Sequence, residues 1–393
     1  MFNPKSLATT LALAVLVGIG PLSTDMYLPA LPQMARELGV NAGQIQLTLS
    51  LFLAGFAVAQ LIYGPLSDRF GRKPVMLGGL LLFIISSIAC ALADSIITLT
   101  LARFLQALGG SAGPVLGRAI VRDIHGPKES GRVLSHIASA MALAPAVAPI
   151  AGGYMTAYWG WASIFWFLAL FAMSGFLLMM LKIAESAPQQ FRQPKSMGRM
   201  LADYSILLKD RLFIGYTLSC TFVFSGIFSF LSGAPFVVID YFGVNEKRFG
   251  LLFTLIVIGY MSGTLSGGHL SRRFGHRKLV GIGAMISLLS GGLLFYFGAG
   301  TPQHVMLIIA PMMVFMTGVG LVMPQAMAGA LEHYPHMAGS ASGLFGFIQM
   351  SIAGLVGIVV GHGYDGTPFI MSMMIALSGL SGLLAYWLFI RPE

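Results

Sequence analysis

The sequence predicts an all-α integral membrane protein with twelve transmembrane helices in two pseudo-symmetric halves of six. Three observations predict this fold class: an excess of apolar residues, their grouping into runs of about 20, and a charged motif that occurs twice. A run of about 20 residues is the length of helix that spans a hydrocarbon core. Hydrophobic residues fill 56% of the 393 positions, and the mean hydropathy is +0.82. A water-soluble protein of this length could not bury so much apolar surface.

The apolar runs predict the helices in chain order. Runs without alternation of polar and apolar residues indicate helices rather than barrel strands, since backbone groups in lipid must bond within their own segment. The longest polar break, 182–211, is rich in Pro, Gln and Ser. We expect it to be a cytoplasmic linker between the halves 1–181 and 212–393, with a short amphipathic helix near 197–208. The predicted spans are 7–31, 45–66, 75–93, 97–117, 133–155, 161–181, 212–236, 249–268, 279–299, 304–327, 338–361 and 368–390.

The distribution of positive charge predicts the orientation. If both termini are cytoplasmic, 19 of the 23 Lys and Arg residues fall in cytoplasmic breaks. Only Arg36, Lys247 and Arg248 then lie in outer loops, and positively charged loops stay on the cytoplasmic side. The net charge of +9 therefore reflects topology. It does not indicate a nucleic-acid partner, because the basic residues form no continuous face.

A charged motif is repeated along the chain. The stretch GPLSDRFGRK, residues 64–73, holds four charges, and GGHLSRRFGHRK, residues 267–278, nearly repeats it. The two halves are therefore expected to be parallel repeats. Arg272 stands where the first copy has Asp68, so only the first copy carries an acid. A shift of 204 positions aligns Leu66, Ser67, Arg69, Phe70 and Gly71 with Leu270, Ser271, Arg273, Phe274 and Gly275.

Two opposite charges lie inside predicted spans. Asp25 is the one carboxylate of fourteen that is well inside a span, and Arg103 is the one basic residue without a loop. At about 1.5 Å per residue, both lie about 9 Å below the outer surface. We expect them to pair and to face a water-filled cavity, with Asp25 as proton carrier and Arg103 released on protonation. Alternatively, Asp25 reaches the outer rim and Arg103 ties backbone carbonyls.

Few polar side chains remain as candidate substrate contacts. The spans of the second half hold almost no ionisable group, so aromatic and Met-rich cavity walls are expected. Such walls suit a neutral or weakly cationic amphipathic compound. For each candidate, an interhelical hydrogen bond is an equal alternative. The candidates are Tyr27, Gln60, Tyr63, Gln106, Gln325 and Gln349.

Four segments resemble signatures of the major facilitator superfamily, and within it the drug:proton antiporters of the Bcr/CflA type. GPLSDRFGRK resembles the loop signature of the superfamily, with Ser67 where Ala is usual. RFLQALGGSAG, residues 103–113, resembles the signature of helix 4, with Ala107 in place of its first glycine. APAVAPIAGG, residues 144–153, resembles the exporter signature of helix 5, and DMYLPALP, residues 25–32, is similar to the end of helix 1.

The resemblance implies roles for further residues. Asp68 and Arg72 would form an ion-pair network with Asp123 that latches the two halves when the site opens outward; the alternative is that the basic residues only anchor lipid headgroups. Arg103 would be the functional arginine of its signature. The complete set of latch residues is Gly64, Asp68, Arg69, Gly71, Arg72 and Asp123. Independently of the resemblance, the kink-forming residues of helix 5 predict a hinge at Pro145, Pro149, Gly152 and Gly153; the alternative is that they are the Pro and Gly common in any membrane helix.

The resulting hypothesis is proton-coupled efflux of amphipathic, mostly neutral drugs, amphenicol- or bicyclomycin-like, by alternating access. We expect a monomer in the bacterial inner membrane, in contact with the lipid bilayer, a small drug and protons, and with no cofactor or metal. A primary pump is excluded because the phosphate-binding motif G-x-x-x-x-G-K-[ST] is missing from the sequence, and no enzyme activity is expected. The alternative function is proton-coupled import or export of a small metabolite such as an amino acid or sugar.

Overall fold

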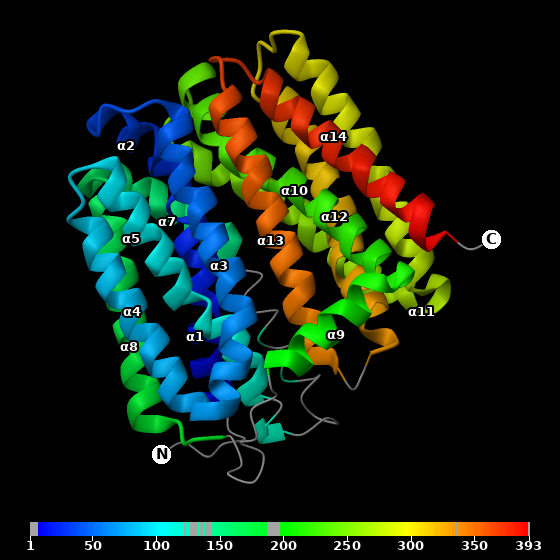
Figure 1. The fold of residues 1–393 in the computed structure, drawn as a ribbon. Helices are drawn as coiled ribbons and strands as arrows, with labels where there is room; N and C mark the ends of the chain where they lie inside the picture. Colours follow the sequence, from blue (N-terminus) through cyan, green and yellow to red (C-terminus); the bar gives the residue numbers. More distant parts are fainter. Residues whose placement is uncertain are drawn as a thin grey trace. The chain divides into compact units, whose positions relative to one another are not determined.

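The computed structural model describes residues 7–121, 123–125, 133, 137, 144–186, 197–334 and 337–391. Every regular element within these ranges is a helix (Figure 1). By length and composition, ten of the described helices are long and apolar enough to cross a membrane. The predicted all-α membrane class is therefore confirmed. Part of the predicted span 133–155 lies outside the described residues.

The chain divides into two compact units. The first comprises Met1–Ala30 and Leu51–Ser196, and the second comprises Leu31–Ser50 and Met197–Glu393. The helix α3 (Ala42–Phe70) contributes to both. A segment from the beginning of the chain thus packs within the same unit as the whole C-terminal part.

Close backbone approaches hold the first unit together. A Cβ atom on Gly113 would lie 2.0 Å from the carbonyl oxygen of Leu16, and one on Gly109 would lie 2.6 Å from that of Gly79. Only glycine permits such contacts, as is common between membrane helices. The helices of this unit, besides most of α3, are α1 (Leu7–Asp25), η1 (Leu28–Ala30), α4 (Arg72–Ala91), α5 (Ile96–Gly110), the helical residues 112–121, α7 (Ala144–Trp159) and α8 (Ala162–Lys182).

The second unit repeats this kind of packing. A Cβ atom on Gly259 would lie 2.1 Å from the carbonyl oxygen of Met313, and one on Gly263 would lie 2.1 Å from that of Thr317. Its helices are α2 (Leu31–Glu37), the start of α3, α9 (Met197–Lys209), α10 (Arg211–Ala234), η3 (Pro235–Tyr241), α11 (Glu246–Ala299), α12 (Met306–Glu332), α13 (Ala338–Gly363), α14 (Phe369–Ala385) and η5 (Tyr386–Ile390).

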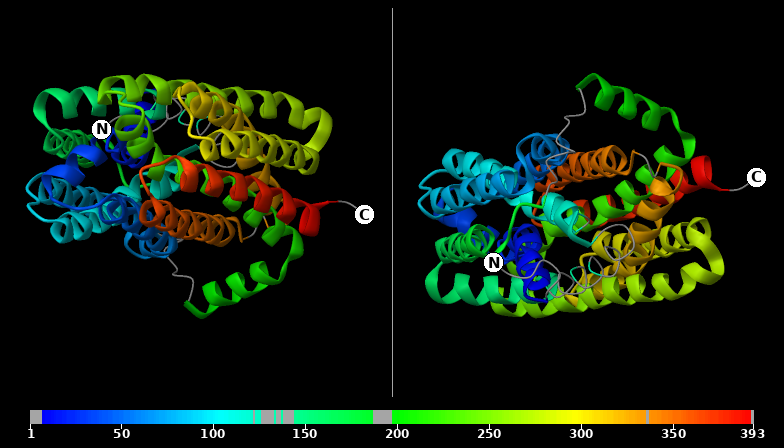
Figure 2. Two further views of the ribbon diagram at one scale, coloured as in Figure 1. Left: turned by 90° about the horizontal axis from the view of Figure 1, so that it is seen from above. Right: turned by 90° about the horizontal axis from the view of Figure 1, so that it is seen from below.

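The predicted amphipathic helix near 197–208 is present as α9. It packs against α10 and α13 of its own unit and lies at the edge of that unit (Figure 2). Leu207 is fully buried there, while Ile206 and Leu208 are half exposed. The hydroxyl of Ser340, near the start of α13, donates a hydrogen bond of 3.0 Å to the Asp203 carboxylate. Both polar and apolar contacts thereby fix the helix to its unit.

The two charged motifs are more helical than the polar breaks predicted from the sequence. The helix α3 continues to Phe70, and Gly71 alone separates it from α4. In the second copy, Gly275 is the one non-helical residue inside α11 and divides it into two helices. A glycine at positive φ redirects the chain within a single residue, so no longer loop is needed.

Candidate functional site

Arg103 lies on α5 and is fully buried among aromatic rings of the first unit. Its guanidinium carbon is 4.2 Å from the ring centre of Phe52, 4.4 Å from that of Tyr27 and 5.8 Å from that of Phe165. These distances allow a cation–π interaction with each ring. Rings from three different segments of the first unit thus enclose one positive charge away from solvent.

Hydrogen bonds satisfy only part of this guanidinium. Its Nη1 donates to the backbone oxygen of Ser23 at 3.2 Å and to Oε1 of Gln106 at 2.5 Å. The amide of Gln106 in turn donates to Ser87 Oγ at 2.8 Å. Within the described part of the chain, Nε and Nη2 of Arg103 have no hydrogen-bond partner. Buried donors without partners are costly, so these two are available to an acceptor that arrives in another state.

Asp25 is buried at the end of α1, 8% exposed. The predicted ion pair between Asp25 and Arg103 is not formed: among the described residues, neither side chain makes a salt bridge. Arg103 contacts the chain two positions earlier, at the carbonyl of Ser23, because the surrounding rings and Gln106 fix its direction. Arg103 therefore contacts the backbone close to Asp25 without forming an ion pair with the Asp25 side chain.

The predicted hinge residues lie on α7, which packs against α1 and η1. Gly152 packs directly against the backbone that follows α1: a Cβ atom there would lie 2.0 Å from the carbonyl oxygen of Met26, the residue after Asp25. Pro149 lies within the helix and is buried with Gly153, while Pro145 is its second residue. The glycine brings α7 against the end of α1, so a displacement of α7 would reach the neighbourhood of Asp25.

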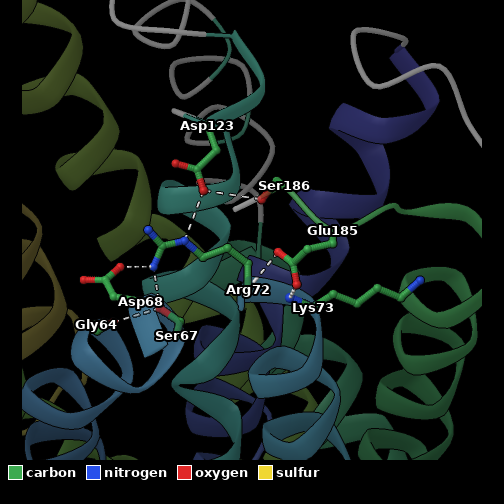
Figure 3. A network of polar contacts seen from close by, with 8 residues as sticks. All are labelled: Gly64, Ser67, Asp68, Arg72, Lys73, Asp123, Glu185 and Ser186. Carbon is green, nitrogen blue, oxygen red and sulfur yellow. Dashed lines mark hydrogen bonds and ion pairs between the residues drawn. The ribbon is translucent and has the colours of Figure 1, made fainter. Parts of the chain in front are cut away.

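The ion-pair network expected around Arg72 is present (Figure 3). Arg72 Nη1 donates to Asp68 at 2.6 Å, and Nε donates to Asp123 at 3.1 Å. Nη1 also donates to Ser67 Oγ. The Arg72 side chain is 16% exposed and that of Asp123 17%, against 40% for Asp68. The contact with Asp123 is therefore the better shielded one, and it ties the start of α4 to the segment around residue 123.

Glu185 also belongs to this network, and the sequence reasoning missed it. Its carboxylate accepts hydrogen bonds from the backbone N–H groups of Arg72 at 3.0 Å and Lys73 at 3.2 Å. It thus caps the N-terminus of α4, where Gly71 has no side chain to do so, and a negative charge is favourable there. Ser186 Oγ donates to Asp123 at 3.4 Å. An uncapped helix start after a glycine was the signal that could have prompted a search for a distant acid.

The remaining predicted latch residues do not join these ion pairs. Arg69 lies over the ring of Phe70, 5.1 Å from its centre, and is exposed. The carbonyl of Gly64 accepts the hydroxyl of Ser67 at 2.9 Å. A Cβ atom on Gly71 would lie 2.5 Å from Glu185 Oε2, so the glycine makes room for the capping carboxylate.

The second copy of the motif keeps the backbone pattern and changes the partners. Arg273 lies 5.5 Å from the ring centre of Phe274, and Ser271 Oγ donates to Gly268 at 3.0 Å, as in the first copy. His276 occupies the position equivalent to Arg72, and its Nδ1 is 2.8 Å from Oε1 of Gln325. Gln325, a predicted substrate contact, is thus hydrogen-bonded to the second motif within its own unit.

The other predicted substrate contacts are not gathered in one place. Tyr27 and Gln106 meet at Arg103, as described above. Tyr63 is 8% exposed and its hydroxyl lies against Gly79, while Gln60 is half-buried on α3. In the second unit, the Gln349 amide donates to Cys220 Sγ at 3.6 Å. Only the pair at Arg103 therefore forms a cluster with a charged group.

Residues 31–50 make polar contacts inside the second unit that no sequence signal suggested. Gln46, fully buried, donates from Nε2 to Ser232 Oγ at 2.7 Å. A Cβ atom on Gly357 would lie 2.7 Å from this amide nitrogen, and one on Gly361 would lie 2.8 Å from Gln46 Cβ. The two glycines form a G-x-x-x-G pattern on α13, which permits close helix packing. An exposed ion pair of 3.2 Å between Arg36 and Asp240 accompanies this contact.

A duplicated bundle of membrane helices with a buried, partly unpartnered arginine is typical of secondary transporters. The chain belongs to the Major Facilitator Superfamily, whose family model matches residues 13–358. It is accordingly a multi-pass membrane transporter and not an enzyme.

Three relatives align with most of the chain. The uncharacterized MFS-type transporter YdgK of Bacillus subtilis strain 168 is 35% identical over 98% of this chain and 97% of its own length. The bicyclomycin resistance protein homolog of Haemophilus influenzae is 30% identical over 96% and 94%. The chloramphenicol resistance protein of Pseudomonas aeruginosa is 32% identical over 90% and 83%. Among solved structures, a D-xylose-proton symporter has a TM-score of 0.76 at 18% identity, over 98% of both chains, and supports the fold alone.

Proposed function

We propose that this transporter exports amphipathic, mostly neutral drugs, amphenicol- or bicyclomycin-like, from bacterial cells in exchange for protons. It would act as a monomer in the inner membrane with both termini cytoplasmic. The names of two relatives, a bicyclomycin resistance protein homolog and a chloramphenicol resistance protein, support this substrate class. The positive charge of the polar breaks supports the orientation.

The observation that carries proton coupling is the incomplete bonding of Arg103 near Asp25. Arg103 has two donors without a described partner, and it contacts α1 only two residues from a buried carboxyl. A protonated Asp25 needs no cation, whereas an ionised Asp25 in the membrane requires one. We infer that proton loss from Asp25 draws these free donors toward it, and that proton gain restores the arrangement described above.

The coupling of this step to transport would run through α7. Gly152 touches Met26, so a shift of the α1 end on pairing would press on α7. Drug release outward and proton uptake would favour one arrangement, and proton release inward with drug binding would favour the other. In the same cycle, the Arg72 network would act as the latch that holds the cytoplasmic side closed.

The test uses inside-out membrane vesicles, an imposed pH gradient and a radiolabelled amphenicol. We expect Asp25→Asn to abolish gradient-driven transport while leaving drug binding measurable, because the carboxamide cannot exchange a proton. Asp365→Asn, which changes an exposed carboxylate, is the matched control. Undiminished gradient-driven transport by Asp25→Asn would remove Asp25 from the mechanism. If the unmodified protein protected a pump-deficient host against no drug of an amphenicol and bicyclomycin panel, export of a metabolite would be favoured instead.

A further inference from the structure

A groove of about 370 Å³ runs between α4 and α5 on the outside of the first unit. Its walls include Ile85 and Leu101, 58% and 60% exposed, with Leu105 further along. Residues at intervals of three and four on each helix line it, so it follows the two helix axes. Exposed apolar side chains of this kind on membrane helices face hydrocarbon.

The groove is apolar along its length and charged at one end. Ser86 and Thr98 line it, but their hydroxyls already donate to backbone oxygens of their own helices. At the turn between the helices it ends at Asp94, which is exposed and forms no ion pair with any described residue. No Lys or Arg occurs between residues 74 and 102. An occupant must therefore combine a long apolar part with a cationic group at one end.

The dimensions match one lipid chain. The lining runs from Leu82 to Leu92 along α4, which is about 15 Å at 1.5 Å per residue. One leaflet is half of a hydrocarbon core of about 30 Å, so it has the same depth. The start of α5 at Ile96 adds the positive end of a helix dipole beside Asp94, which is suited to a phosphate. A zwitterionic headgroup finds a partner for each of its charges at this turn.

We propose that this groove binds a phospholipid with a primary ammonium headgroup, such as phosphatidylethanolamine, with one acyl chain between α4 and α5 and the ammonium group at Asp94. None of the residues that line the groove belongs to the proposed proton-coupling or substrate contacts. An anionic lipid without an ammonium group, such as phosphatidylglycerol, meets the carboxylate without compensation and binds less well.

The experiment is native mass spectrometry of the purified full-length protein. Lipids with identical acyl chains and ethanolamine, choline or glycerol headgroups are titrated in turn. We expect ethanolamine lipid to bind about two- to fivefold more tightly than glycerol lipid, the range of an exposed ion pair. Asp94→Asn should remove this preference, and Asp365→Asn, at another exposed carboxylate, should keep it. An unchanged preference in Asp94→Asn would overturn the assignment of the headgroup.

A second pair of variants tests the acyl chain. Ala89 lines the groove and is exposed. Ala89→Phe fills the groove, and we expect it to lose one bound lipid, whereas Ala89→Ser should not. Unchanged lipid occupancy in a folded Ala89→Phe protein would overturn the proposal. The proposal would also be overturned if Ala89→Phe lost binding of a hydrophobic cation such as tetraphenylphosphonium and kept its lipid, because the groove would then be a drug site. Because lipid is counted directly, neither result depends on whether the protein exports drugs.

Discussion

Arg36 and Asp240 form an ion pair of 3.2 Å across 204 positions of sequence. The same interval separates the two copies of the charged motif. A residue of the first repeat thus contacts the equivalent position of the second, and the contact lies in the unit that also holds Gln46, Gly357 and Gly361. This group of contacts is a candidate for one closure of the alternating-access cycle proposed above.

The buried part of this closure should matter more than the exposed ion pair. The side chains of Arg36 and Asp240 are 58% and 39% exposed, so their pair contributes at most about 1 kcal/mol. We expect Arg36→Ala to leave transport nearly unchanged. Gly361→Val, whose new side chain would meet Gln46, should instead force the closure open and impair transport at least tenfold. Reaction of a cysteine placed at Ser232 with a membrane-impermeant thiol reagent measures the opening, and equal reaction in both variants would contradict the ranking.

Glycine at the two motif junctions should differ in tolerance. Gly71 has φ 98° and Gly275 has φ 73°, both in the region that disfavours other residues. We expect Gly275→Ala to cost about 1–3 kcal/mol through backbone strain alone. Gly71→Ala adds a clash with Glu185, so its loss of thermal stability should be larger. Thermal unfolding of the two purified variants in one detergent gives the comparison, and equal losses would mean that Glu185 moves aside freely.

Arg103 should be needed for transport but not for stability. A buried charge with unmet hydrogen bonds carries a desolvation cost that its contacts do not fully offset, and an apolar residue of similar length does not carry this cost. We therefore expect Arg103→Met to abolish gradient-driven efflux without lowering the midpoint of thermal unfolding. Arg248→Met, at an exposed arginine, serves as the control for both measurements. A fall of many degrees in Arg103→Met would support the alternative that Arg103 ties the helices together.

Gly152 should tolerate no side chain. The added Cβ of Gly152→Ala would lie 2.0 Å from the Met26 carbonyl, so α7 would have to move away from the end of α1. We expect a loss of transport of tenfold or more, with a lower unfolding temperature. Gly78→Ala is the matched control, since a Cβ atom there meets no atom within 4 Å. Wild-type transport by a folded Gly152→Ala protein would exclude the proposed passage of motion through α7.

The sequence predicted the fold class well because the length of each apolar run can be counted directly along the chain. Helix positions and the equivalence of Gly71 with Gly275 could be obtained by counting along the chain. The network around Arg72 was instead expected from the resemblance of its motif to the loop signature of the superfamily, because the sequence alone does not pair Arg72 with Asp123. Helix ends were less accurate at the two charged motifs, where a single glycine replaced the expected polar loop.

The contacts of the site were harder to predict because depth does not fix direction. Asp25 and Arg103 were correctly placed within the helices, yet equal depth says nothing about which way a side chain points around its helix axis. The rings of Phe52 and Phe165 determine that direction for Arg103, and neither could be chosen among 28 Phe residues. Glu185 and Gln46 were missed because their partners are distant in sequence and uncharged backbone or amide groups.

The two junction glycines are alike, but the side chains beside them respond differently to the surrounding electrolyte. Arg72 holds Asp68 and Asp123 through partly exposed ion pairs, which dissolved salt screens, whereas His276 meets Gln325 through a single hydrogen bond to an amide. Raising ionic strength should therefore weaken the contacts beside Gly71 more than those beside Gly275. A change in salt concentration would then act on the proposed transport cycle at the Arg72 network and not at the contact between His276 and Gln325.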